Sequence, residues 1–242
     1  MNFEKKVIIV TGVSSGIGEG CAKKLLACNA HVIGFDLRPG KLTEKNYQHY
    51  LVDVRDAAQV SAIVDEVAAH FDKIDGLVNC AGIFSCSKPF YEMTVEEWNK
   101  VISINLTGTF LCTRFVTPHM ITQRQGKIVN ISCIRSQIFR PGMADYSASK
   151  GGVVALTSAM ALDLAPFNIQ VNSVGPGFTF TGMTAAEFCR PEVKASSEQL
   201  IPLGRIAEPS DIADTILFLL SDLSNYITGQ TIFTDGGFKI AK

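Results

Sequence analysis

The stretch TGVSSGIG, residues 11–18, follows the apolar run VIIV at 7–10 and precedes a segment of helical length. Its glycines have the spacing G-x-x-x-G-x-G. Glycines permit a tight turn between strand and helix, and they let a pyrophosphate approach the free N–H groups at the helix N-terminus. We therefore expect a dinucleotide to bind at this turn. The candidate contacts are Gly12, Ser14, Ser15, Gly16, Ile17 and Gly18.

Apolar runs of strand length alternate with helix-length segments along the rest of the chain. The strand runs are 31–35, 49–52, 76–79, 127–131, 169–174 and 231–234, and the helical segments are 16–28, 57–71, 96–121, 147–165 and 209–221. The runs do not alternate with polar residues, as is typical of strands buried on both faces. This pattern predicts one α/β domain over 1–242, a doubly wound Rossmann fold with a parallel seven-stranded sheet and helices on both faces. We expect a cofactor half, roughly 1–130, and a catalytic and substrate half, roughly 131–242.

Charge and cysteine content narrow the class of partner. The chain has 22 basic and 23 acidic residues, so no electrostatic footprint for nucleic acid or a membrane surface is expected. The seven cysteines form no C-x-x-C pair and no Cys/His cluster, which argues against a metal site and favours reduced thiols in the cytoplasm. No signal peptide or membrane-spanning run is evident. A cytoplasmic protein with a small-molecule substrate is therefore expected.

Polar residues follow the next predicted strands. Asp36 stands near the offset, about 20 residues after the glycine turn, at which a carboxylate binds an adenosine ribose hydroxyl. That carboxylate would repel a 2′-phosphate, so NAD(H) is preferred to NADP(H). Arg38 argues instead for NADP(H), because an arginine at this position can bind the 2′-phosphate. After the third and fourth strands, the expected contacts to adenine and its ribose are Asp53, Val54, Asn79, Ala81 and Gly82.

Tyr146 and Lys150 lie one helical turn apart in the run YSASK. A phenol, with an ordinary pKa of about 10, transfers protons poorly at neutral pH. A neighbouring ammonium group favours its ionised form. The spacing therefore predicts that Tyr146 acts as an acid/base.

The glycine turn, Asp53, NCAG at 79–82, Asn105, YSASK and Pro176-Gly177 together resemble the short-chain dehydrogenase/reductase family along essentially the whole chain. The resemblance implies a nicotinamide cofactor, hydride transfer between C–OH and C=O carbons, and usually a homotetramer. It implies that Tyr146 exchanges a proton with the substrate oxygen, and that Lys150 lowers the tyrosine pKa and holds the nicotinamide ribose. Asn105 would bend its helix and hold a water. Contacts at the nicotinamide end would be Pro176, Gly177, Thr179 and Thr181.

One position departs from the family pattern, because Cys133 stands where the family has a catalytic serine. A thiol donates a weaker hydrogen bond than a hydroxyl. Three explanations compete: Cys133 serves in the serine role, a local shift brings Ser132 or Ser136 into place, or the protein is an NAD(H)-binding sensor or scaffold with little turnover. In an extended strand, Ser132 should point away from the face of residue 133.

Substrate choice is expected to lie between Gly182 and Ile201, where the family places a lid. Met183 and Phe188 are candidate substrate contacts, and Arg140 could pair with an anionic group. Some stretches, including VIGFD at 32–36 and RPGM at 140–143, are similar to 2,3-dihydro-2,3-dihydroxybenzoate dehydrogenases. We expect oxidation or reduction of a small cyclic or polyhydroxylated substrate. The alternatives are a sugar or polyol dehydrogenase and a 3-oxoacyl-acyl-carrier-protein reductase.

Overall fold

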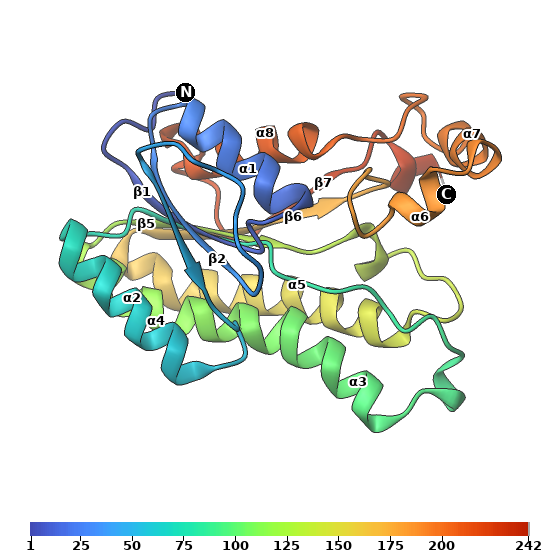
Figure 1. Ribbon diagram of the computed structural model, residues 1–242, viewed down its shortest axis with the longest axis horizontal. Coiled ribbons are helices and arrows are strands. Elements are labelled where there is room, and N and C mark those ends of the chain that lie inside the picture. Colours follow the sequence, from blue (N-terminus) through green and yellow to red (C-terminus); the bar gives the residue numbers. More distant parts are fainter. Residues whose placement is uncertain (242) are drawn as a thin grey trace.

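The computed structural model describes residues 1–241 and contains one seven-stranded sheet, whose strand order is β3-β2-β1-β4-β5-β6-β7 (Figure 1). The strands are β1 (Val7–Thr11), β2 (His31–Asp36), β3 (Tyr47–Leu51), β4 (Gly76–Asn79), β5 (Gly126–Ile131), β6 (Ile169–Pro176) and β7 (Thr231–Thr234). Every neighbouring pair is parallel. The predicted doubly wound parallel sheet is confirmed.

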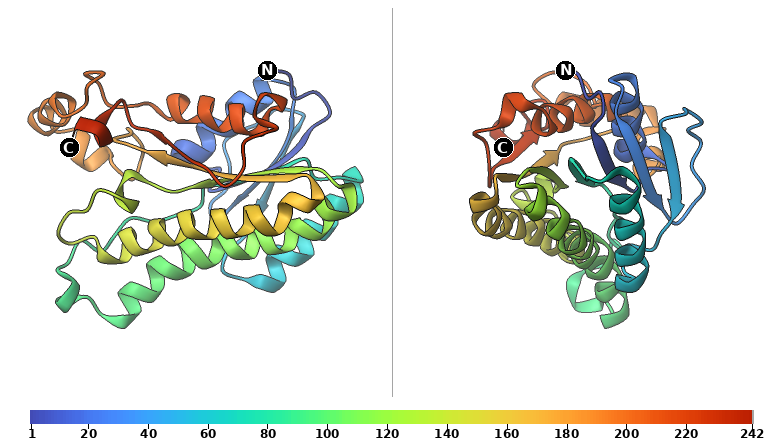
Figure 2. Two further views of the ribbon diagram at one scale, coloured as in Figure 1. Left: turned by 180° about the vertical axis from the view of Figure 1, so that it is seen from behind. Right: turned by 90° about the vertical axis from the view of Figure 1, so that its left-hand side faces the viewer.

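Helices cover both faces of the sheet. They are α1 (Gly16–Ala27), α2 (Ala57–Phe71), α3 (Val95–Ile102), α4 (Gly108–Gln123), α5 (Ala144–Leu164), α6 (Ala185–Phe188), α7 (Pro191–Gln199) and α8 (Pro209–Leu220). Helices α1 and α8 pack together on one face, whereas α2, α4 and α5 cover the other (Figure 1 and Figure 2). The segment predicted to be a lid contains α6 and α7, which lie beyond the carboxyl end of the sheet.

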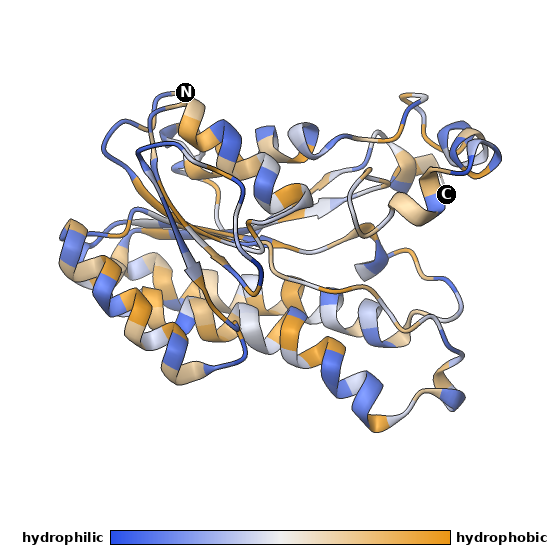
Figure 3. Cartoon of the chain, in the orientation of Figure 1, coloured by the Kyte–Doolittle hydropathy of each residue, from blue (hydrophilic) through white to orange (hydrophobic). Residues whose placement is uncertain are grey.

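Two hydrophobic cores form because the central strands are buried on both faces. In β1, Ile8 and Val10 face the core under α1 and α8, and Val7 and Ile9 face the core under α2, α4 and α5. Burying each such side chain contributes about 1.5–3 kcal/mol. Figure 3 shows the corresponding hydrophobic colours along the strands, and hydrophilic colours on much of α7. The continuous apolar runs of the sequence thus reflect burial on both sides.

The predicted helical segment 96–121 is helical throughout, but a π-helical turn lies within it. Helix α3 ends at Ile102, a π-helical turn occupies Ser103–Thr107, and α4 begins at Gly108. The turn contains Asn105, whose side chain makes tertiary hydrogen bonds described below. Helix α5 also begins at Ala144, ahead of the predicted 147, so Tyr146 lies in its first turn.

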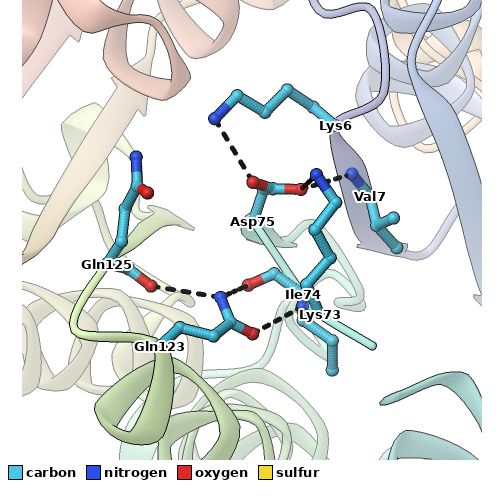
Figure 4. Close-up of polar contacts among 7 residues, drawn as sticks. All are labelled: Lys6, Val7, Lys73, Ile74, Asp75, Gln123 and Gln125. Atoms are coloured by element: carbon cyan, nitrogen blue, oxygen red, sulfur yellow. Dashed lines mark hydrogen bonds and ion pairs between the residues drawn. The ribbon is translucent and has the colours of Figure 1, made fainter. Parts of the chain in front are cut away.

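At the amino end of the sheet, one carboxylate joins three segments (Figure 4). Asp75 accepts a 2.8 Å hydrogen bond from the Val7 N–H and lies 3.2 Å from Lys6 Nζ and 2.9 Å from Lys73 Nζ. Nearby, the Gln123 amide pairs with both the N–H and the carbonyl of Ile74. These contacts hold β1, β4 and the end of α4 together at the edge opposite the functional cavity.

Candidate active site

A cavity of about 720 Å³ opens beyond the carboxyl ends of the strands. It lies where β1 and β4 are neighbours, the point at which the chain reverses its direction across the sheet, and ligands of such sheets bind there. The cavity is lined by most predicted site residues: Gly12, Ser15, Gly16, Ile17, Gly18, Asp36, Asp53, Val54, Ala81, Gly82, Ser132, Cys133, Arg140, Tyr146, Lys150, Pro176, Gly177, Thr179, Thr181, Met183 and Phe188.

Three predicted residues, Ser14, Asn79 and Asn105, lie outside the cavity lining. The buried Asn79 amide donates to Thr113 Oγ1 at 3.1 Å and to Asn130 Oδ1 at 2.8 Å, so its side chain cross-links β4, α4 and β5. The Asn79 side chain is thus packed in the interior, and the expected approach of the 79–82 backbone to an adenine ribose stays a prediction.

The glycine turn is shaped by close approach to the backbone after β4. Gly12 has φ of +67°, and a Cβ there would lie 2.8 Å from Ala81 Cα. A Cβ on Gly18 would lie only 2.2 Å from the Gly12 carbonyl oxygen. The Ala81 N–H also donates to Thr11 Oγ1 at 3.0 Å. The turn therefore presents bare backbone at the N-terminus of α1, which suits a pyrophosphate group.

At the far end of the cavity, a carboxylate and a guanidinium lie together. Asp36 accepts backbone hydrogen bonds from Ser14 N and Arg38 N, each at 3.0 Å. The Arg38 Nη2 donates to Ser15 Oγ at 2.8 Å, and its Nε lies 3.7 Å from Asp36 Oδ1. The Arg38 side chain is 67% exposed, so it is free to contact a ligand at the cavity edge. This end can bind either a ribose hydroxyl, through Asp36, or a phosphate, through Arg38.

At the other end of the cavity, Tyr146, Lys150 and Cys133 meet. The Lys150 Nζ donates to the Ile131 carbonyl at 2.7 Å and lies 5.8 Å from the centroid of the Tyr146 ring. Burial lowers the Lys150 pKa. Burial, together with the charge and hydrogen bonding of Cys133, raises the Tyr146 pKa well above its ordinary value. The net direction is opposite to the lowered pKa that we expected, because desolvation of the phenolate outweighs the lowering effect of the Arg135 charge. The expected contribution of Lys150 stays a prediction.

The two serines near Cys133 are engaged by backbone carbonyls. Ser132 Oγ donates to the Lys150 carbonyl at 3.0 Å, and Ser136 Oγ donates to the Cys133 carbonyl at 2.7 Å. Ser132 and Cys133 both line the cavity, but of these residues only Cys133 interacts with the Tyr146 side chain. The thiol therefore occupies the position next to the tyrosine, and no local shift brings either serine there.

Asn105 ties the loop after β4 to α5. Its Oδ1 accepts from Ile83 N at 2.8 Å, and its Nδ2 donates to Ile83 O at 3.0 Å and to Ser149 Oγ at 3.1 Å. The π-helical turn interrupts the helix at this residue, as a bend at Asn105 requires. Asn105 thus positions the loop and helix that flank Tyr146, and the water predicted beside it stays a prediction.

Sequence reasoning missed several residues of the cavity wall. Arg135 lies in a 3-10 turn after β5, Phe84 packs on the Tyr146 ring with centroids 5.2 Å apart, and Glu187 lies on α6. Only Arg135 had a sequence signal, because it follows Cys133 by two positions in NISCIRS. The other two depend on how distant loops fold together.

A family model described as enoyl-(acyl carrier protein) reductase matches residues 12–239. The chain belongs to the short-chain dehydrogenase/reductase family. It is 39% identical to the 3-oxoacyl-(acyl-carrier-protein) reductase of Thermotoga maritima, over 99% of this chain and 100% of the relative. It is 36% identical to the cis-4-hydroxycyclohexanecarboxylate dehydrogenase of Sinomonas cyclohexanicum, over 98% of this chain and 97% of the relative.

The structure is also similar to that of ElxO with NADP bound, with a TM-score of 0.91 and 30% identity over 96% of this chain and 98% of ElxO. Short-chain dehydrogenases/reductases bind nicotinamide cofactors, and this chain is an oxidoreductase that acts on alcohol or ketone substrates. Within residues 1–241, no group of three or more His, Cys, Asp or Glu side chains could hold a metal ion. In the same range, no helix is both long and apolar enough to cross a bilayer.

Gly18→Ala tests the shape of the turn in this short-chain dehydrogenase/reductase. The added Cβ would collide with the Gly12 carbonyl, so we expect nicotinamide nucleotide affinity to fall about tenfold or more and stability to fall by about 1–3 kcal/mol. Fluorescence titration and chemical denaturation measure the two effects. The matched control is Gly151→Ala in α5, where a Cβ meets nothing within 4 Å. That helical site should gain about 0.5–1 kcal/mol. Equal behaviour of the two variants would contradict the steric argument.

Proposed function

We propose that the enzyme transfers hydride between NAD(H) and a secondary alcohol or ketone of a small cyclic or polyhydroxylated substrate. The observation that carries the proposal is the meeting of Tyr146, Cys133 and Lys150 in a cavity that begins at the glycine turn. The bare backbone of that turn suits a pyrophosphate at one end, and Tyr146 and Lys150 line the other. Residues 1–130 would supply most of the cofactor contacts, and the rest would supply the chemistry.

In this proposal, the substrate oxygen lies between the Tyr146 phenol and the Cys133 thiol. Tyr146 donates a proton to that oxygen during ketone reduction and accepts one during alcohol oxidation. Cys133 donates the second, weaker hydrogen bond. When bound, the nicotinamide supplies or accepts the hydride. Lys150 would hold the nicotinamide ribose hydroxyls and favour the ionised phenol, opposing the burial that raises the Tyr146 pKa.

The preference for NAD(H) rests on Asp36. A ribose 2′-phosphate near this carboxylate would be repelled, and Asp36 is held in place by two backbone N–H groups. Arg38 favours NADP(H), and the similar protein ElxO has NADP bound in its structure. We infer that Asp36 dominates because its side chain is only 10% exposed whereas that of Arg38 is 67% exposed.

Asp36→Asn should reverse the cofactor preference. Removing the negative charge should raise the affinity for NADPH relative to NADH about tenfold or more, because Arg38 then meets the 2′-phosphate without competition. The matched variant Arg38→Gln should weaken NADPH binding and leave NADH binding nearly unchanged. Both effects are measured as dissociation constants by fluorescence titration. A wild-type enzyme that already prefers NADPH would refute the NAD(H) proposal.

A 3-oxoacyl-acyl-carrier-protein reductase is the second candidate, because a relative with that name matches the whole chain. A candidate from another class is an NAD(H)-binding sensor with little turnover, since Cys133 replaces the family serine. All three readings predict nucleotide binding. The change in absorbance at the NADH band separates them. Turnover of acetoacetyl thioesters would favour the acyl reductase, turnover of cyclic diols, polyols or ketones would favour the proposed function, and turnover of none would favour the sensor.

Tyr146→Phe and Cys133→Ser separate enzyme from sensor. Tyr146→Phe should lower kcat by about 10²–10⁴-fold, while nucleotide affinity is retained.

Cys133→Ser should preserve or raise kcat. Cys133 raises the Tyr146 pKa, so its replacement should move the ascending limb of the pH profile for alcohol oxidation, which follows the ionised phenol, to lower pH. Steady-state pH profiles measure both variants. Collapse of turnover in Cys133→Ser would show that the thiol itself is required.

We also infer a cytoplasmic homotetramer, as is usual in the family. Exposed apolar side chains lie on α4 and α5, including Phe110, which is 45% exposed, and Leu162, which is 79% exposed. Their burial between subunits would be favourable. Light scattering at working concentration should give the mass of four chains. A monomer would refute this inference.

A further inference from the structure

Arg135 is a half-buried cation in the wall of the cavity. It belongs to the 3-10 turn Ile134–Ser136, directly after Cys133, and lines the same cavity as Tyr146. Among residues 1–241, its guanidinium has one hydrogen-bond acceptor, the Ile138 carbonyl at 3.3 Å, and no carboxylate within 4.0 Å. A guanidinium has five N–H donors, and a partly desolvated charge is costly unless it is paired.

The surrounding charges leave this cation unbalanced. Burial and the nearby Arg140 lower the pKa of Arg135, and the negative charges of Cys133, Glu187 and Tyr146 oppose this without forming an ion pair with it. Arg140 has its own neighbour, since its Nη1 lies 3.9 Å from Glu187 Oε1 at the exposed mouth of the cavity. We expected Arg140 to be the anion anchor, but its pairing with Glu187 makes it less suited than Arg135.

Several apolar side chains line the same cavity as Arg135. Phe84, Met143, Phe178 and Phe188 contribute to its lining. Phe188 is only 3% exposed and also packs in the small core of the lid with Ile201. Such walls suit a carbocyclic or aliphatic body, and a fixed guanidinium among them selects a ligand that carries a matching anion.

We infer that the substrate is a hydroxy or keto acid with a compact apolar body, and that Arg135 binds its carboxylate while Tyr146 and Cys133 meet its reacting oxygen. This inference rests on the proposed function for the reacting oxygen, but the anion site stands on Arg135 and the cavity alone. Arg135 is thus a specificity-determining residue. Arg140 and Glu187 form the outer rim, where Arg140 adds a second positive charge.

Binding of two matched probes tests the site without turnover. Calorimetric titration with cyclohexanecarboxylate and with its neutral amide, with and without NADH, is applied to the wild type, Arg135→Gln, Arg135→Lys and Arg124→Gln. The wild type should bind the carboxylate about 10–100-fold more tightly than the amide. Arg135→Gln should abolish this difference, and Arg135→Lys should keep part of it, because an ammonium retains the charge but not the fork geometry.

Arg124→Gln is the control, because Arg124 lies ahead of β5 at the opposite edge of the sheet and should leave both affinities unchanged. NADH affinity should be equal in all four proteins, which excludes a cofactor phosphate as the partner of Arg135. Equal affinity of the wild type for both probes, no binding of either, or an equal loss of both in Arg135→Gln would overturn the inference.

Turnover separates this inference from the proposed function. The substrates are 4-hydroxycyclohexanecarboxylate and the neutral cyclohexanol, each with NAD⁺ and NADP⁺. If cyclohexanol is oxidised in a Tyr146-dependent way and the carboxylate gives no advantage, the function stands and the anion site is wrong. If the carboxylate binds through Arg135 but neither alcohol nor any ketone reacts, the anion site stands and the proposed function is wrong.

Discussion

The close approach of the glycine turn to the backbone after β4 is the constraint on which the site depends. Because Gly12 has no side chain, the backbone of Cys80 and Ala81 lies directly against the turn, and because Gly18 has none, the start of α1 lies directly against the Gly12 carbonyl. The same loop reaches the chemical end of the cavity, since a Cβ on Gly82 would lie 3.2 Å from Asn105 Oδ1 and 3.7 Å from Lys150 Nζ. A single packed loop therefore connects the glycine turn to Lys150.

The polar side chains around Tyr146 are of two kinds: some bond to other atoms of the protein, and others are available to a ligand in the cavity. Ser132, Ser136 and Asn105 bond to main-chain atoms or to other buried side chains, and so fix the end of β5 and the start of α5. Cys133 and Arg135 remain for a ligand. A cysteine at position 133 is thus a weaker hydrogen-bond donor than a serine would be, while the hydrogen bonds of Ser132, Ser136 and Asn105 are made.

The sheet could be predicted from the sequence because burial on both faces leaves continuous apolar runs, and the turn because only glycine tolerates its contacts. The family resemblance implied a bend at Asn105, but the contacts of Asn105 with Ile83 and Ser149 could not be predicted, because these residues are distant in sequence. The prediction that the Tyr146 pKa is lowered was wrong for a similar reason. The spacing to Lys150 shows a favourable charge, but it does not show the burial that raises the pKa. Arg135 went unrecognised because its exposure is set by the turn after β5.

The central claim is that Cys133 takes the place of a serine beside Tyr146. The most direct measurement is a crystal structure with NADH and a ketone or carboxylic-acid analogue bound. The account predicts Cys133 Sγ and Tyr146 OH within hydrogen-bond distance of the same ligand oxygen, with Ser132 still bonded to the Lys150 carbonyl. A ligand oxygen held by Ser132 or Ser136, with the thiol turned away from the nicotinamide, would contradict it.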